Sequence, residues 1–200
     1  MKLDKLLLAT TNPGKVREIR GILRGAPVEI ISLDSLPPIE EPRETGRTFA
    51  ENARLKALYY NAATGLPSVA DDSGLEVDAL DGAPGIHSAR WHGTDYAVKF
   101  RRIYELLRER GAPGSPARFV CAVALAAGGR IEYEAEGTVE GRIADEPRGT
   151  NGFGYDPIFF YPPLGRTLGE VPDEVKATLS HRGAAFRAVR QYLAGLPTFR

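Results

Sequence analysis

The feature of this 200-residue chain that most limits its possible folds is the alternation of short apolar segments and amphipathic segments. Residues 5–11 form a continuous apolar run that ends in turn-forming residues, which is typical of a short buried strand. Apolar residues between 16 and 23 then recur at helical spacing. Two later strands, 117–127 and 130–143, are joined at Gly128-Gly129, a two-residue hairpin signal. We therefore expect an α/β fold, a mixed sheet with flanking helices.

Capping signals set the helix bounds. Asn12 is a good N-cap before Pro13, and Thr48-x-x-Glu51 is a capping box. The expected strands cover residues 5–11, 28–33, 68–70, 117–127 and 130–143. The expected helices cover residues 13–25, 48–63, 95–110 and 173–196, and the last helix is interrupted near Ser180-His181. We expect the third strand to break at Asp71, and residues 75–94 to be too irregular for a long element.

Composition and charge exclude several classes of protein. The 26 basic and 26 acidic residues give zero net charge, which disfavours a nucleic-acid binder. The longest apolar run, 121–127, is far shorter than the roughly 18 residues of a membrane span. No signal peptide is recognisable at the N-terminus. A single cysteine excludes an internal disulfide and a cysteine zinc site. We expect a soluble, cytoplasmic protein.

The turn between the first strand and the first helix is a candidate phosphate site. The first turn of a helix presents unpaired N–H groups and the positive end of the helix dipole. Side-chain donors and one lysine adjoin it: the turn consists of Thr10, Thr11, Asn12, Pro13, Gly14 and Lys15. An ordinary N-cap with a solvated lysine is the alternative.

Acidic residues at the end of the third strand form a candidate metal site. Asp71 and Asp72 follow an apolar strand, where open α/β sheets place their ligands. If the strand continues, the two carboxylates point to opposite sides, so only one needs to face a ligand. Carboxylate oxygens suit Mg²⁺, and the acidic loop with Glu40, Glu41 and Glu44 could supply a second one. A polar turn is the alternative.

Two further segments could contact a flat ligand. The glycine-rich loop 149–156 contains Phe153 and Tyr155 and can bring a ring and backbone amides against a base. His181 and Arg182, within the last helical segment, could donate hydrogen bonds to carbonyl oxygens. A glycine-rich loop beside a buried strand and a solvated helix surface are the respective alternatives.

Six segments in register resemble the non-canonical purine nucleoside triphosphate pyrophosphatase family, also called the inosine/xanthosine triphosphate pyrophosphatases. The likeness spans residues 5 to about 193. Its segments are Thr10 to Glu18, Glu44 to Ala57, Ala70 to Leu75, Gly82 to Arg90, Gly152 to Phe159 and Lys176 to Gly183. The resemblance implies one domain over residues 1–200, an elongated two-lobed fold with a central substrate cleft.

The resemblance also implies an activity and roles for residues. It implies Mg²⁺-dependent hydrolysis of inosine, deoxyinosine and xanthosine triphosphates (ITP, dITP and XTP) to the monophosphate and pyrophosphate, by a homodimer. Glu44 and Asp72 would hold the metal, and Asp72 would accept a proton from the attacking water. Residues 10–15 with Lys56 would bind the triphosphate, and Ser73 would contact the substrate. The nucleobase pocket would consist of Phe153, Gly154, Tyr155, Asp156, Lys176, His181 and Arg182.

Two positions depart from the family pattern, and two rival functions stay open. Family members often have asparagine in the third helix, where this chain reads Tyr96-Ala-Val-Lys-Phe100, and Asn151 stands where a small residue is common. One rival is a pyrophosphatase of modified pyrimidine nucleoside triphosphates. The other is a nucleotide-binding module without catalysis. We expect neither nucleic acid nor membrane as a partner.

Overall fold

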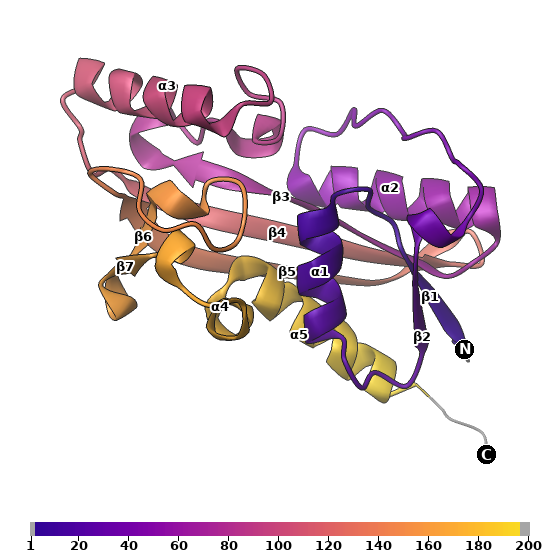
Figure 1. Cartoon of the computed structure of the whole chain (residues 1–200). Coiled ribbons are helices and arrows are strands. Elements are labelled where there is room, and N and C mark those ends of the chain that lie inside the picture. The colour runs from indigo at the N-terminus through magenta and orange to yellow at the C-terminus, as the bar shows by residue number, and fades with distance from the viewer. Residues whose placement is uncertain (1–2, 197–200) are drawn as a thin grey trace. The chain divides into compact units, whose positions relative to one another are not determined.

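The computed structural model describes residues 3–196, over which it has five α-helices and a seven-stranded sheet (Figure 1). The strand order is β2-β1-β3-β4-β5-β6-β7. β1 pairs in parallel with β2 and β3, whereas β6 pairs antiparallel with β5 and β7. The strands are β1 Lys5–Leu8, β2 Glu29–Ser32, β3 Ser68–Val77, β4 Pro116–Ala127, β5 Arg130–Ile143, β6 Phe159–Tyr161 and β7 Arg166–Thr167. The helices are α1 Pro13–Ile22, α2 Phe49–Thr64, α3 Tyr96–Glu109, α4 Asp173–Leu179 and α5 His181–Ala194. The mixed α/β class is confirmed.

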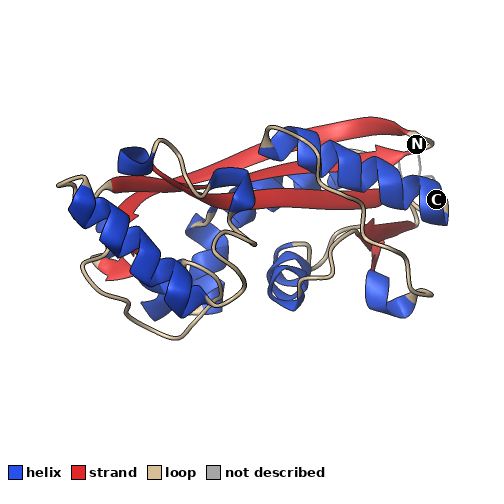
Figure 2. Cartoon of the chain, turned by 90° about the horizontal axis from the view of Figure 1, so that it is seen from above, coloured by secondary structure: helices blue, strands red, loops and turns tan. Residues whose placement is uncertain are grey.

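The chain divides into two compact units. Unit 1 comprises the described residues of Met1–Asp72, Cys121–Gly137 and Arg182–Arg200. Unit 2 comprises Ser73–Val120 and Thr138–His181. Helices lie alongside strands in each unit (Figure 2). No helix among residues 3–196 is long and apolar enough to cross a membrane.

The core of unit 1 is built on β1. Leu6, Leu7 and Leu8 are all fully buried, so both faces of this strand are covered, as in the parallel part of an α/β sheet. α1 begins at the predicted cap, where the Asn12 side chain accepts a hydrogen bond from the Lys15 N–H. α2 begins at Thr48, whose side chain accepts from the Glu51 N–H. These caps fix the starts of the two helices that carry candidate site residues.

The core of unit 2 forms where α3 packs on the strands. Buried apolar side chains come from β3, α3 and the segment around β6, among them Leu75, Ile103 and Phe159. Asp95 caps α3 by accepting from the Ala97 N–H. The helix therefore starts where the sequence predicts it, and its first turn faces the glycine-rich loop, because Tyr96 packs edge-on against Tyr155.

Three features of the fold differ from the sequence-based expectation. β3 does not break at Asp71 but continues to Val77, so that prediction is wrong. A charged side chain rarely lies inside a central strand, but partners far along the chain compensate this one, as described below. β6 and β7 were not expected, because runs of three and two residues carry too little periodicity to be recognised.

Candidate functional site

The two neighbouring aspartates of β3 face opposite sides of the strand. Asp71 contacts Lys15, Arg182 and the thiol of Cys121. Asp72 contacts Asn52 and Lys56 of α2. The alternation expected of a continuous strand is therefore confirmed, and the nearest side-chain contacts of the two carboxylates differ.

Asp72 and Glu44 converge on one ammonium group. Lys56 Nζ lies 2.7 Å from Glu44 Oε1 and 3.3 Å from Asp72 Oδ1. Asn52 Nδ2 donates to Asp72 Oδ2 over 3.0 Å, and Asn52 Oδ1 accepts from the Gly46 N–H over 2.8 Å. Asn52 thus joins the loop that carries Glu44 to the strand that carries Asp72. No feature of the sequence pointed to this role of Asn52.

The closeness of Gly46 to α2 explains why this position of the loop is a glycine. A Cβ built on Gly46 would lie 2.6 Å from Asn52 Oδ1 and 2.8 Å from the Glu51 Cβ. Any side chain would push the loop away from the helix, and Glu44 would move with it. The glycine in the Glu44-Thr-Gly46 segment therefore serves the position of the acidic residue.

Charge and burial set the protonation states in this cluster. Burial alone would lower the pKa of Lys56, but Asp72, Asp71 and Glu44 outweigh it and raise the pKa, so the ammonium stays charged. Burial is the largest influence on Asp72 and raises its pKa, although the Lys56 and Lys15 ammonium groups oppose the shift. A carboxylate with a raised pKa is a better proton acceptor than an exposed one.

The chemistry of this cluster fits a divalent cation. Two carboxylates already share the ammonium of Lys56, which occupies the kind of position that a small cation would take. Residues 3–196 contain no group of three or more His, Cys, Asp or Glu side chains that could hold a metal ion. A site with two protein carboxylates suits Mg²⁺, which keeps waters and substrate phosphates as its other ligands.

Asp71 lies at the centre of a buried network of four charges. Its Oδ2 is 3.0 Å from Lys15 Nζ and 3.3 Å from Arg182 Nη2, and Arg182 Nη1 donates to Glu18 over 2.7 Å. Burial alone would raise the pKa of Asp71, but Lys15 and Arg182 hold it far below its ordinary value. Asp71 therefore stays ionised and ties α1, β3 and α5 together. This role was not anticipated from the sequence.

The predicted phosphate turn is preorganised by its own side chains. Asn12 Oδ1 accepts from the Lys15 N–H, and Thr10 Oγ1 accepts from the Asn12 N–H. The Thr11 hydroxyl donates to Glu41 over 2.6 Å. Lys15 Nζ is directed toward Asp71, in the same unit as the acidic pair. The structure therefore gathers residues 10–15 with Glu44, Lys56 and Asp72 in unit 1.

The glycine-rich loop is held by Asp156. This buried carboxylate accepts from the Phe153 N–H over 2.8 Å and forms an ion pair with Lys176 of α4. The Lys176 ammonium also lies 5.0 Å from the centre of the Phe153 ring. Gly152 has a φ of 70°, and a Cβ there would lie 2.1 Å from Asp156 Oδ2. The loop therefore requires glycine at 152.

The remaining predicted residues differ in their burial and in their contacts. Tyr155 is buried and its hydroxyl donates to the Ser88 carbonyl over 3.0 Å, so its side chain belongs to the core of unit 2. The buried ring of His181 stacks on Phe119 at 4.7 Å. Gly154 lies beside Tyr96, and Ser73 is half-buried within β3. Arg182, in contrast, belongs to the charge network of unit 1.

The chain is similar to known proteins over most of its length. Residues 6–192 match the sequence model of the Ham1 family. A protein of Exiguobacterium sp., named dITP/XTP pyrophosphatase, is 48% identical and aligns over 92% of this chain and 93% of its own length. One of the same name from Thermus thermophilus is also 48% identical, over 96% of this chain and 94% of its own.

Solved structures give the same result. A HAM1 protein from Coxiella burnetii is 39% identical, covers 98% of this chain and 100% of its own, and has a TM-score of 0.86. The Ham1 protein of Staphylococcus aureus is 36% identical, with a TM-score of 0.84 over 96% of this chain and 98% of its own. The motifs that led to the resemblance lie within the matched residues. The chain therefore belongs to the Ham1 family.

Proposed function

We propose that this protein hydrolyses dITP, XTP and ITP to the monophosphate and pyrophosphate, and so removes deaminated purine nucleotides from the precursor pool. The observation that carries the proposal is the convergence of Glu44 and Asp72 on Lys56, in the same unit as the phosphate turn. The names of the relatives support the substrate class. We further propose Mg²⁺ as the cofactor, one domain, a homodimer, and the cytoplasm as the location of this pool.

In the proposed reaction, the protein binds the charged phosphate groups of the substrate and accepts one proton. Water attacks the α-phosphorus, the bond from that phosphorus to the oxygen bridging it to the β-phosphate breaks, and pyrophosphate departs. Asp72 accepts the proton of the water. Lys56 and Lys15, with the N–H groups that begin α1, would bind the phosphate oxygens. When bound to Glu44 and Asp72, Mg²⁺ would neutralise charge on the triphosphate.

The choice of base would rest on the 6-position of the purine. Inosine and xanthosine carry an oxygen there, whereas adenine carries an amino group. N–H groups of the loop around Phe153, with Lys176 and His181, would donate to that oxygen, and adenine would leave them unpaired. Sites built on such hydrogen bonds can discriminate by about 10⁴-fold. The aromatic ring of Phe153 offers a stacking surface beside the Lys176 ammonium.

A panel of nucleoside triphosphates, assayed for pyrophosphate and for orthophosphate, tests the proposal. We expect dITP, XTP and ITP to release pyrophosphate with Mg²⁺ present, and ATP to be turned over far more slowly. Equal turnover of ATP, or release of orthophosphate, would contradict it. A preference for modified pyrimidine triphosphates would identify the first rival function, and binding without turnover would identify the second.

A further inference from the structure

Lys99, in the second turn of α3, is a charged side chain buried inside unit 2 for which the proposed reaction has no direct use. It is fully buried, and within residues 3–196 its ammonium forms no ion pair with a carboxylate. Burial lowers the pKa of this ammonium. Burying an ammonium group without a counter-ion costs free energy, so stability alone does not explain a lysine here.

The partners of Lys99 lie at the end of the Gly82–Arg90 segment. Its Nζ donates to the Ser88 carbonyl over 3.0 Å and to the Ala89 carbonyl over 2.7 Å. The same ammonium lies 4.2 Å from the centre of the Tyr96 ring, a cation–π contact. Two carbonyls and one aromatic face therefore take the place of a counter-ion. This gives a structural use to a segment that the resemblance included without a role.

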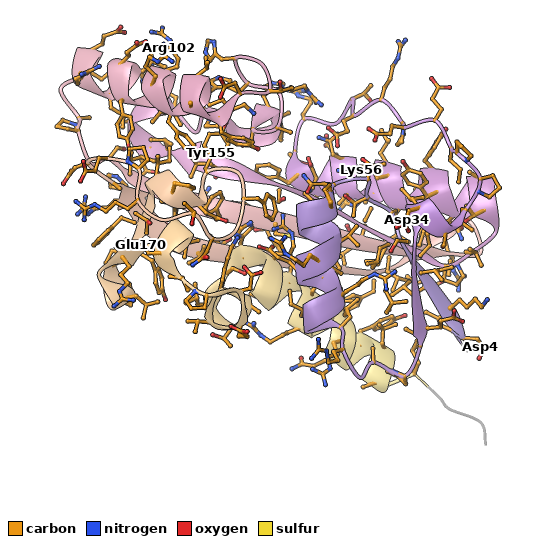
Figure 3. All side chains as sticks on the ribbon, in the orientation of Figure 1. Asp4, Asp34, Lys56, Arg102, Tyr155 and Glu170 are labelled. Atoms are coloured by element: carbon orange, nitrogen blue, oxygen red, sulfur yellow. The ribbon has the colours of Figure 1, made fainter. Side chains whose placement is uncertain are left out.

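The Ser88 carbonyl is also the acceptor for Tyr155. The Tyr155 hydroxyl donates to it over 3.0 Å, so one carbonyl oxygen binds both the helix and the glycine-rich loop. Ser88 itself is fixed, because its hydroxyl donates to the Gly85 carbonyl and accepts from the Leu75 N–H of β3. Figure 3 shows Tyr155 at the α3 side of unit 2.

The ring of Tyr155 completes the link to the loop. It packs edge-on against Tyr96 at 5.2 Å and lies 6.2 Å from Phe100, both on the first turns of α3. A Cβ on Gly154 would be 3.5 Å from the Tyr96 hydroxyl. Residues 152–156 therefore have one hydrogen-bonded anchor on this side, and Lys99 holds the carbonyl that provides it.

We propose that Lys99 is a positioning residue, which fixes the Ser88 carbonyl and thereby holds Tyr155 and the backbone of residues 152–156 in place for nucleobase recognition. The proposal rests on the proposed function, in which this loop contacts the base. Lys99 does not touch substrate. Its loss should therefore affect contacts to the base but leave the contacts to the phosphates in unit 1 unchanged.

The test compares a substrate with a base and a probe without one. In Lys99→Met, which keeps the length of the side chain but not its charge, we expect kcat/KM for dITP to fall ~10- to 100-fold, mainly through KM. The inhibition constant of inorganic tripolyphosphate, measured against dITP, should stay within about twofold of wild type. An unchanged KM, or an equal weakening of tripolyphosphate, would overturn the proposal.

Ile103→Val is the matched control. Ile103 is fully buried one turn further along α3, and the change removes one methylene from the same core without touching Ser88. It should lower the thermal midpoint while leaving KM for dITP unchanged. If it raises KM as much as Lys99→Met does, the effect of Lys99 is one of general destabilisation and the proposal fails.

Hydrogen exchange separates this proposal from the proposed function. We expect Lys99→Met to speed amide exchange at residues 152–156 and not at residues 44–56, whether or not dITP is a substrate. Unchanged exchange at residues 152–156 would overturn the proposed role of Lys99. Absence of pyrophosphate release by the wild type would instead reject the proposed function. If Lys99→Met does not fold, Tyr155→Phe replaces it in the test, because this variant deletes only the hydroxyl bound to Ser88. We expect Tyr155→Phe to speed amide exchange at residues 152–156, and unchanged exchange in this variant would reject the proposal.

Discussion

Asp71 and Asp72 show how two adjacent identical residues acquire different chemistry. Strand alternation turns one toward α1 and α5 and the other toward α2. Burial would raise the pKa of both carboxyl groups. At Asp71 the nearby Lys15 and Arg182 outweigh it and the pKa falls, whereas at Asp72 burial outweighs Lys56 and Lys15 and the pKa rises. One residue stays ionised and organises cations, and the other is the one that we propose as proton acceptor and metal ligand.

Asp72→Asn should abolish turnover of dITP. The amide keeps the size of the side chain but cannot accept a proton and is a poorer metal ligand, so we expect kcat to fall by more than about 100-fold. Initial rates of pyrophosphate release at saturating dITP measure the change. Glu134→Gln is the matched control, because that carboxylate is exposed in the same unit and, among residues 3–196, binds only Arg54. Retention of most activity by Asp72→Asn would refute the assigned role.

Lys15→Ala should weaken binding of the triphosphate. Its ammonium adjoins the first turn of α1, and loss of one charge-assisted contact predicts a rise in KM of about tenfold. The protein should also lose stability, because Asp71 then keeps Arg182 but loses its nearest cation. Steady-state kinetics and thermal unfolding measure the two effects. If KM and kcat both remain at the wild-type values, Lys15 serves Asp71 alone.

At the scale of elements, helix spacing explains why α2 carries two of the site residues. Asn52 and Lys56 are four residues apart and therefore lie on the same face of the helix. Both reach Asp72, and through Gly46 and Glu44 both also reach the acidic loop. Figure 3 labels Lys56 on this helix. The helix thus sets the distance between the two carboxylates.

Gly152→Ala tests the glycine-rich loop as an element. The added Cβ would meet Asp156, and alanine also resists the φ of 70°, so we expect the loop to shift and kcat/KM for dITP to fall by roughly 100-fold. Gly165→Ala is the control, since its φ of 61° is similar but nothing lies within 4 Å of the added Cβ. It should cost stability and leave kinetics unchanged. Similar kinetics in the two variants would contradict our account of the loop.

Capping and turn residues predicted those elements whose bounds depend on neighbouring residues in the sequence. Asn12 and Thr48 cap helices as expected, and the hairpin turns at Gly128-Gly129, where both glycines have positive φ. The course of β3 past Asp71 could not be predicted, because it depends on cations at Lys15 and Arg182, far away in the sequence. The short strands β6 and β7 depend in the same way on their neighbours in the sheet.

At the scale of the whole molecule, the candidate residues separate by chemistry. Those expected to bind metal and phosphate lie in unit 1, and most of those expected to bind the base lie in unit 2. The chain passes between the units after residues 72, 120, 137 and 181, so a single cut would not separate them. Motifs named the candidate residues of the site. They could not predict that Asn52, Asp71 and Lys99 position the others, since those roles depend on contacts between distant segments.

The reactivity of the Cys121 thiol measures how well unit 1 excludes solvent around Asp71. The thiol is fully buried 3.8 Å from Asp71, and burial, followed by the charge of Asp71, raises its pKa. The thiolate is the reactive form, so at pH 8 the folded protein presents an unreactive, protonated and inaccessible thiol. In the unfolded chain the pKa returns to about 8.5 and the thiol reacts.

We therefore expect alkylation of Cys121 by iodoacetamide at pH 8 to be negligible over hours in the native protein and to follow the unfolding transition in urea. Because the folded state disfavours the thiolate, raising the pH above the unfolded pKa should lower stability. In the background Cys121→Ala, the variant Thr94→Cys places a thiol at an exposed position and should react within minutes. Fast native labelling of Cys121 would mean that the strand carrying it opens well below the global transition, and that the charge network does not close this part of the protein.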